Sequence, residues 1–307
     1  MREGDDARTA VTEAGRRTTS RRDLARNERF EQISPEIGEL DETALDQYLE
    51  EDPDAALSLL AEMAGATDER LRELSRRLAG RIALGVARHH HARRRGVGRL
   101  RSSRADDSGG DLDLDASIDA IVAARAAGRA PRADDLVVRA WDRPGTALSL
   151  VIDRSGSMSG PRLAAAAVAI AAVIYRQGDD CSVIAFSDEA IVLKSQGEHR
   201  NPDDVVSDLL TLRGHGVTDV GLALRAARAQ LDRSRSGRRV AVLVSDCRVT
   251  QGGDPSPHAA GIDEIAIIAP ADDTADAEAL AVAIGARWVP LAGPADVPEA
   301  VSRALQR

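Results

Sequence analysis

Hydrophobic and polar positions follow two regimes along this chain, and the change falls near residue 147. Beyond that point, short runs that are almost wholly apolar alternate with longer stretches of helical periodicity. The apolar runs predict strands at 147–153, 181–187, 190–194, 239–245, 263–269 and 287–292. The periodic stretches predict helices at 161–177, 202–212, 219–233, 275–285 and 295–306.

This succession of strands and helices predicts the fold class. A strand that is apolar throughout is covered on both faces, which is typical of a mostly parallel sheet. The 190–194 strand is different, because only the short turn Phe186–Ala190 precedes it. We therefore expect it to be an antiparallel edge. The predicted fold is α/β, with a doubly wound, mostly parallel six-stranded sheet preceded by a small all-α module.

The chain before this sheet divides by composition. Residues 1–36 are rich in Arg, Glu, Asp, Thr and Gly and lack apolar periodicity, so we expect them to be disordered. Residues 37–105 are expected to form a helical module, in which Asp41 and the pair Asp52-Pro53 have the character of helix starts. The remaining boundaries place a linker with a short helix at 106–146 and the sheet domain at 147–307.

Composition narrows the class of protein. The 307 residues carry a net charge of −9, although arginine is dense at Arg16–Arg29 and Arg88–Arg104. Cys181 and Cys247 are too few for a disulfide framework, so we expect reduced thiols. No apolar segment follows the first methionine, and the longest apolar run, Leu163–Tyr175, is too short to span a bilayer. These features predict a cytoplasmic protein that binds neither membranes nor nucleic acid.

Oxygen-bearing side chains gather where two predicted strands end. Asp153 ends the first strand, and Ser155 and Ser157 follow it on a tight turn. Asp246 follows the fourth strand, and Thr218 follows a loop flanked by glycines. Ligands of open α/β sheets bind at the carboxyl ends of the strands, so we expect these side chains to meet. An oxygen-only set suits a hard cation such as Mg²⁺, or Mn²⁺ in its place.

At these residues the chain resembles the von Willebrand factor A (VWA) family. The metal-ion-dependent adhesion site (MIDAS) of that family has the pattern Asp-x-Ser-x-Ser, then a loop threonine, then an aspartate at a strand end. The resemblance runs from near Ala147 to the C-terminus. It implies that the serines, and in some states Thr218, bind the metal directly, whereas the aspartates often act through water. It also implies that an acidic side chain of a partner protein fills the remaining coordination position.

Several residues beside this set have alternative interpretations. Asp219 is either a carboxylate that supports a metal ligand or, as we favour, the residue that starts the next helix. Cys247 stands where relatives usually have glycine, which bears on the local loop geometry, and a thiol near the metal is the minor alternative. His215 is expected to be a loop residue near the partner surface. His89–His91 point in different directions along a helix, so we expect a solvated basic face.

A second resemblance precedes the sheet domain. The basic run Arg93–Arg104 followed by Gly109–Asp115 is similar to a stretch of the magnesium-chelatase large subunit and of CoxE-like proteins, although a solvated linker explains the arginines equally well. Those relatives act beside MoxR-type or chelatase-type AAA+ ATPases. The chain has no Gly-x-x-x-x-Gly-Lys-Ser/Thr loop of its own. The resemblance therefore implies a metal-dependent adaptor that is not an enzyme and that binds a MoxR-type AAA+ ATPase or its client.

Two other functions fit the sequence less well. A phosphatase or phosphotransferase of the haloacid-dehalogenase class needs a second aspartate where this chain has Ser155, and a lysine. The one lysine of the chain, Lys194, falls on the predicted edge strand. A serine hydrolase would need its nucleophile at Met158. An extracellular VWA adhesion module is opposed by the absence of a secretory signal and of a disulfide framework.

Overall fold

The computed structural model describes residues 1–89, 99–104, 111–131, 136–142, 145–155, 160–212 and 216–306. The chain contains two units. One combines Met1–His91 with Thr146–Arg307, and the other is Ala92–Gly145.

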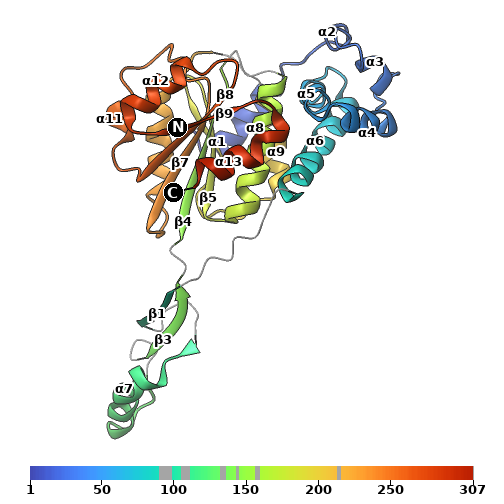
Figure 1. Cartoon of the computed structure of the whole chain (residues 1–307). Coiled ribbons are helices and arrows are strands. Elements are labelled where there is room, and N and C mark those ends of the chain that lie inside the picture. The colour runs from blue at the N-terminus through green and yellow to red at the C-terminus, as the bar shows by residue number, and fades with distance from the viewer. Residues whose placement is uncertain are drawn as a thin grey trace. The chain divides into compact units, whose positions relative to one another are not determined.

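The strands of the larger unit form the sheet that the apolar runs predict. Its described residues give a six-stranded sheet with the order β6-β5-β4-β7-β8-β9 (Figure 1). Neighbouring strands are parallel, except that β5 and β6 are antiparallel. The bounds are β4 Thr146–Asp153, β5 Cys181–Phe186, β6 Ala190–Lys194, β7 Arg238–Val244, β8 Glu264–Pro270 and β9 Arg287–Leu291. The predicted doubly wound α/β fold is confirmed.

Helices cover both faces of this sheet (Figure 1). Successive side chains of a strand point to opposite faces, so Leu150 and Ile152 of β4 enter one core and Val151 enters the other. The first core is covered by α8 Pro161–Gln177, α9 Pro202–Thr211 and α13 Val297–Ala304, which follows the 3-10 turn η2 Pro294–Asp296. The second core is covered by α10 Val220–Leu231 and α12 Ala275–Ile284, and α11 Ser256–Ala259 contacts α10.

The helices that precede the sheet pack against α8. They are α4 Glu42–Glu51, α5 Pro53–Met63 and α6 Glu69–His89. Asp41 caps α4 by accepting from the backbone N–H groups of Thr43 and Ala44, and Asp52 caps α5 by accepting from the N–H of Ala55, as the sequence predicts. Because α5 and α6 lie against α8, that helix is buried over Leu163–Ile174 on every side. These helices and the sheet therefore share one core.

Residues 1–36 contain three helices and are packed against the rest of the unit, contrary to the prediction of disorder. They contain α1 Asp5–Ala14, α2 Arg21–Leu24 and α3 Phe30–Ile33. Leu24, Phe30 and Ile33 are buried in the core that α5 and α6 also line. The Arg21 guanidinium lies 5.0 Å from the centre of the Phe30 ring, a cation–π contact that helps this arginine-rich segment to pack. The prediction fails because a few widely spaced apolar residues are enough to hold this segment in place when other helices supply the rest of the core.

Residues 1–4, here called the N-terminal arm, lie along β6. The Arg2 N–H donates to the Ala190 carbonyl at 2.8 Å, and the Val192 N–H donates to the Arg2 carbonyl at 2.9 Å. The Glu3 carboxylate accepts two hydrogen bonds from Arg233, one of them at 2.7 Å, and a third from the Ser195 hydroxyl at 2.6 Å. The arm is thus attached to the sheet by both backbone and side-chain bonds.

The smaller unit contains the short helix that the sequence predicts, together with strands that it does not. Its described residues give an antiparallel sheet of order β1-β3-β2. The bounds are β1 Arg99–Arg104, β2 Asp111–Leu112, β3 Val137–Asp142 and α7 Leu114–Ala126. Half of the predicted basic run therefore becomes β1, whereas Arg93–Arg95 and His90–His91 lie outside the described residues. None of the described helices combines the length and apolar character needed to cross a membrane.

Candidate functional site

The predicted oxygen donors begin with Asp153, the last residue of the central strand β4. Its side chain is buried, with the whole residue 1% exposed. Oδ1 accepts from the Ser155 N–H at 2.7 Å, and Oδ2 accepts from the Ser245 hydroxyl at 2.6 Å. Burial raises the pKa of Asp153 above its ordinary value, although the hydrogen bonds from Ser245 and Ser155 oppose the shift. Asp153 is therefore a carboxylate held in a fixed orientation away from bulk water.

Asp246 reaches the same place from the neighbouring strand. β7 pairs with β4 in parallel up to the pair Ile152 and Val244, so the residues that follow both strands emerge side by side. Asp246 is 4% exposed, and its charge contributes to the raised pKa of Asp153. Its Oδ1 accepts from the backbone N–H of Arg248 at 3.2 Å. The topology thus brings together the two carboxylates that the sequence predicts.

Thr218 is itself buried and lies on the segment that leads into α10. Its N–H donates to the Thr250 hydroxyl at 2.9 Å, and its carbonyl accepts from the N–H groups of Thr250 and Gln251. These bonds join the segment to the loop that follows Asp246. Asp219 accepts from the Leu222 N–H at 2.8 Å and is the N-cap of α10, which confirms its role at the helix start.

The serines of the motif are only partly described. Ser155 is buried, and its N–H is directed to Asp153. Ser157 and His215 lie outside the described residues. Among the described residues, no group of three or more His, Cys, Asp or Glu side chains is arranged to hold a metal ion. The predicted set consists of two carboxylates and the hydroxyl groups of two serines and a threonine. All of these ligand atoms are oxygens, so the set fits a hard cation such as Mg²⁺.

Two neighbours of Asp246 shape the loop after β7. Ser245 was not predicted, because a serine at a strand end carries no distinctive signal; its hydroxyl also accepts from the Cys247 N–H at 2.8 Å. Cys247 has a φ of 59°, a left-handed conformation that glycine adopts more easily. This conformation gives a physical reason for the glycine that the VWA resemblance places here. The thiol is buried, and burial raises the pKa of Cys247 to about 12, so it is a neutral packing group.

Arg154, inside the motif, points away from the site. Its guanidinium is buried, and Nη2 lies 3.2 Å from Oε1 of Glu189. The other Glu189 oxygen lies 2.8 Å from Nε of Arg2. Burial lowers the pKa of Arg154. The backbone that presents Asp153 and Ser155 is therefore linked through one glutamate to the N-terminal arm.

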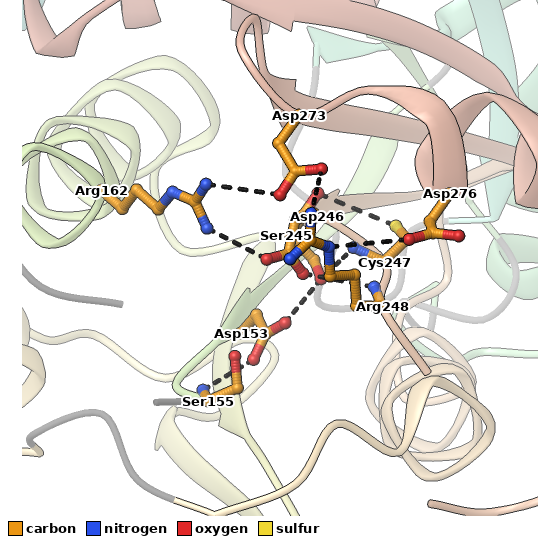
Figure 2. A network of polar contacts seen from close by, with 9 residues as sticks. All are labelled: Asp153, Ser155, Arg162, Ser245, Asp246, Cys247, Arg248, Asp273 and Asp276. Carbon is orange, nitrogen blue, oxygen red and sulfur yellow. Dashed lines mark hydrogen bonds and ion pairs between the residues drawn. The ribbon is translucent and has the colours of Figure 1, made fainter. Parts of the chain in front are cut away.

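A network of arginine and aspartate side chains borders the carboxylates (Figure 2). Arg162 of α8 donates from Nη1 to Oδ2 of Asp246 at 3.0 Å, and its Nη2 lies 3.6 Å from Oδ2 of Asp273. Arg248 donates from Nη2 to Oδ1 of Asp273 at 2.9 Å, and its Nε lies 3.7 Å from Asp276. This network was not predicted, because its members follow two different strands, β7 and β8, or begin the helices α8 and α12.

Comparison with known proteins identifies the domain. Residues 148–249 match the von Willebrand factor type A domain. The chain contains a VWA domain. The matched residues run from β4 to the loop after β7, and they include Asp153, Thr218 and Asp246. VWA domains generally mediate protein–protein interaction or adhesion. No curated protein matches the chain.

Solved structures with a similar arrangement share little sequence with this chain. An aerotolerance-related membrane protein from Bacteroides fragilis is 15% identical, with 52% of this chain and 98% of that chain covered and a TM-score of 0.43. BatB from Bacteroides thetaiotaomicron is 14% identical, with 52% and 97% covered and a TM-score of 0.42. A von Willebrand factor type A protein from Catenulispora acidiphila is 18% identical, with 53% and 42% covered and a TM-score of 0.42.

Proposed function

We propose that this chain is a metal-dependent protein-binding adaptor. Its VWA domain would hold Mg²⁺ or Mn²⁺ with Asp153, Ser155, Ser157, Thr218 and Asp246, and would capture an acidic side chain of a partner. The observation that carries the proposal is that Asp153 and Asp246 are buried side by side at the ends of β4 and β7. Two buried like charges repel each other, so a bound cation would stabilise the pair.

The residues around the carboxylates support this role. Ser245 and the Ser155 N–H hold the two Asp153 oxygens in place, and the Arg248 N–H holds one oxygen of Asp246. When bound, the cation supplies a Lewis-acidic position for an incoming carboxylate. Thr218 lies on a segment bonded to Thr250, so a shift of this segment would be passed to the loop after Asp246.

We further propose that the partner is a MoxR-type AAA+ ATPase or its client, and that the protein is cytoplasmic. The support is the resemblance of the arginine-rich stretch before the sheet to CoxE-like and magnesium-chelatase proteins. The role is that of an adaptor without catalysis of its own. An extracellular adhesion module shares the VWA fold and would also bind its partner through a metal. The adaptor and the adhesion module are therefore distinguished by the identity of the bound partner, not by the metal dependence of binding.

The haloacid-dehalogenase alternative loses support from the position of Lys194. This lysine is fully buried, and Nζ donates to the carbonyls of Asp179 and Cys181 at 3.0 and 2.6 Å. Cys181 begins β5, whereas Asp153 pairs with Phe186 at the end of that strand. Lys194 therefore contacts the opposite end of the sheet from Asp153. This arrangement supports binding over phosphoryl transfer.

The metal site can be tested by calorimetric titration of the full chain with Mg²⁺ and Mn²⁺. Asp153→Ala should abolish binding, because it removes a buried carboxylate ligand. Asp276→Ala is the matched control, since this carboxylate is exposed and contacts only Arg248 among the residues of Figure 2. Equal metal affinity in wild type and Asp153→Ala would refute the site.

The partner is tested by pull-down from the native cytoplasm with and without EDTA. We expect recovery of an AAA+ ATPase to depend on the metal, and Thr218→Ala to behave like chelated wild type. If recovery of the ATPase is unaffected by both EDTA and Thr218→Ala, the domain is a passive scaffold.

A further inference from the structure

Arg162 occupies an unusual place for a cation. It is the second residue of α8, directly after Pro161, where the partial positive charge of the helix dipole disfavours arginine. The first turn of α8 has no acidic residue that would offset this cost. The side chain extends from the helix toward the strand ends, and its guanidinium lies between Asp246 and Asp273 (Figure 2). These two carboxylates, and not the helix, therefore account for the position of the arginine.

The contact with Asp246 is close and largely shielded. The Arg162 side chain is 23% exposed and that of Asp246 is 3% exposed, and the two are joined by a hydrogen bond of 3.0 Å. A charge-assisted pair of this kind is stronger than an exposed surface pair. The two arginines bind different oxygens of Asp246. Arg162 donates to Oδ2, whereas the backbone N–H of Arg248 donates to Oδ1.

The charges of the network do not balance. The carboxylates are those of Asp153, Asp246, Asp273 and Asp276, and the guanidinium groups are those of Arg162 and Arg248. Among the residues of Figure 2, carboxylates outnumber guanidinium groups, so this part of the protein is acidic and would favour a bound cation. Within this network, Asp153 is the carboxylate that contacts neither arginine and is bonded by hydroxyl and N–H groups instead.

We propose that Arg162 is an internal counter-ion that competes with the divalent cation for Asp246. In the metal-free protein the guanidinium neutralises Asp246, and on metal binding it is released toward Asp273. Arg162 therefore sets the affinity of the site and links its occupancy to the start of α8. This inference rests on the metal site proposed above and adds a residue that determines how tightly the site binds.

The sign of the effect separates this role from a purely structural one. If Arg162 competes with the cation, its removal leaves Asp246 more negative and the cation binds more tightly. If Arg162 merely holds Asp246 in a productive orientation, its removal weakens metal binding. Two unit charges a few ångströms apart near a protein surface interact strongly enough that we expect an affinity gain of about tenfold.

Arg162→Gln, Arg162→Lys and Arg248→Gln should be compared with wild type by calorimetric titration of the full chain with Mn²⁺. Arg162→Gln should bind about tenfold more tightly, and Arg162→Lys, which keeps the charge, should stay near wild type. Arg248→Gln is the matched control: it removes a guanidinium from Asp273 but leaves the backbone bond to Asp246 intact. In thermal unfolding without metal, Arg162→Gln should unfold at a lower temperature than wild type, and saturating Mn²⁺ should reduce the difference.

Weaker or unchanged Mn²⁺ binding by Arg162→Gln, with wild type still binding, would overturn the counter-ion role and leave the metal site standing. Absence of Mn²⁺ binding in both wild type and Arg162→Gln would instead overturn the metal site, and the counter-ion role with it. Binding by Arg162→Gln alone would support both proposals.

Discussion

The Ser245 hydroxyl donates a hydrogen bond of 2.6 Å to Oδ2 of Asp153, although the two residues are 92 positions apart in the chain. The bond joins the ends of adjacent strands β7 and β4. It fixes the carboxylate without adding charge, and the same hydroxyl accepts from the Cys247 N–H. One serine therefore orients both the predicted metal ligand and the loop that follows Asp246.

Ser245→Ala should weaken Mg²⁺ binding by about tenfold, because a ligand that loses its orienting partner binds metal less well. It should also lower the free energy of unfolding by about 1–2 kcal/mol through the lost buried bond. Ser182→Ala is the matched control, since its hydroxyl donates to Ser149 at 2.9 Å between β5 and β4. That variant should lose comparable stability by urea denaturation but keep its metal affinity. Equal metal affinities in both variants would contradict the orienting role.

Asp219→Ala should lower the free energy of unfolding by about 1 kcal/mol, because it removes the N-cap of α10. Asn201→Ala, which removes the N-cap of α9, should have a similar effect and serves as a reference. Metal affinity, measured by calorimetry, should be unchanged in both variants. A large loss of affinity in Asp219→Ala alone would instead favour a carboxylate that supports a metal ligand.

The two thiols should be unreactive in the folded protein. Burial raises the pKa of Cys181 to about 11 and that of Cys247 to about 12, from an ordinary value of 9.0. A thiol reagent at pH 8 should therefore label neither residue until denaturant is added. A rapid reaction of either cysteine without denaturant would show that its thiol is accessible.

The same shifts predict loss of stability in alkali. Above pH 9 the unfolded chain releases thiol protons that the folded chain retains, so stability falls as pH rises toward 11 or 12. Each buried thiol should contribute a slope of about 1.4 kcal/mol per pH unit in that window. Cys247→Ala should reduce the slope measured by urea denaturation at pH 8 to 10.5. An identical slope in wild type and variant would contradict the shift.

Glu3→Gln should destabilise the protein at neutral pH and change little in strong acid. Hydrogen bonds from Arg233 lower the pKa of Glu3 to about 2 from an ordinary value of 4.5, so its contribution is present above 4.5 and disappears as pH falls toward 2. The pair is partly exposed, so we expect a loss of about 1 kcal/mol or less at pH 7. Glu13→Gln, whose carboxylate lies 3.9 Å from Arg2, is the control and should have a smaller effect. A Glu3→Gln difference that persists at pH 2 would contradict this account.

The sequence predicts the sheet well because its strands are buried on both faces. Apolar runs such as Ala147–Ile152 have little alternative to a central strand, and a polar residue directly after such a run falls at the carboxyl end of the sheet. Asp153 and Asp246 could be found in this way. Asp219 could also be assigned as a helix N-cap, because this role depends only on residues close to it in the sequence.

Other features depend on contacts that sequence spacing does not reveal. Arg162 and Asp246 are 84 residues apart, and nothing in either neighbourhood indicates that they pair. Phe30 is one large apolar residue among arginines, so its segment has the composition of a disordered chain until α5 and α6 are placed beside it. β1 consists mainly of arginine and serine and is a strand because β3 pairs with it.

The N-terminal arm has a consequence for how this protein can meet another one. An open β-sheet edge exposes unpaired backbone groups that accept a strand from a second chain, which is a route to aggregation as well as to peptide binding. Here Arg2 already bonds to Ala190 and Val192 at the β6 edge, and at the far edge β9 contains Pro290, which has no N–H to donate. Addition of a partner strand is therefore hindered at both edges. A partner of this sheet is therefore more readily recognised by side chains, such as those of the loops at the strand ends, than by backbone pairing at a sheet edge.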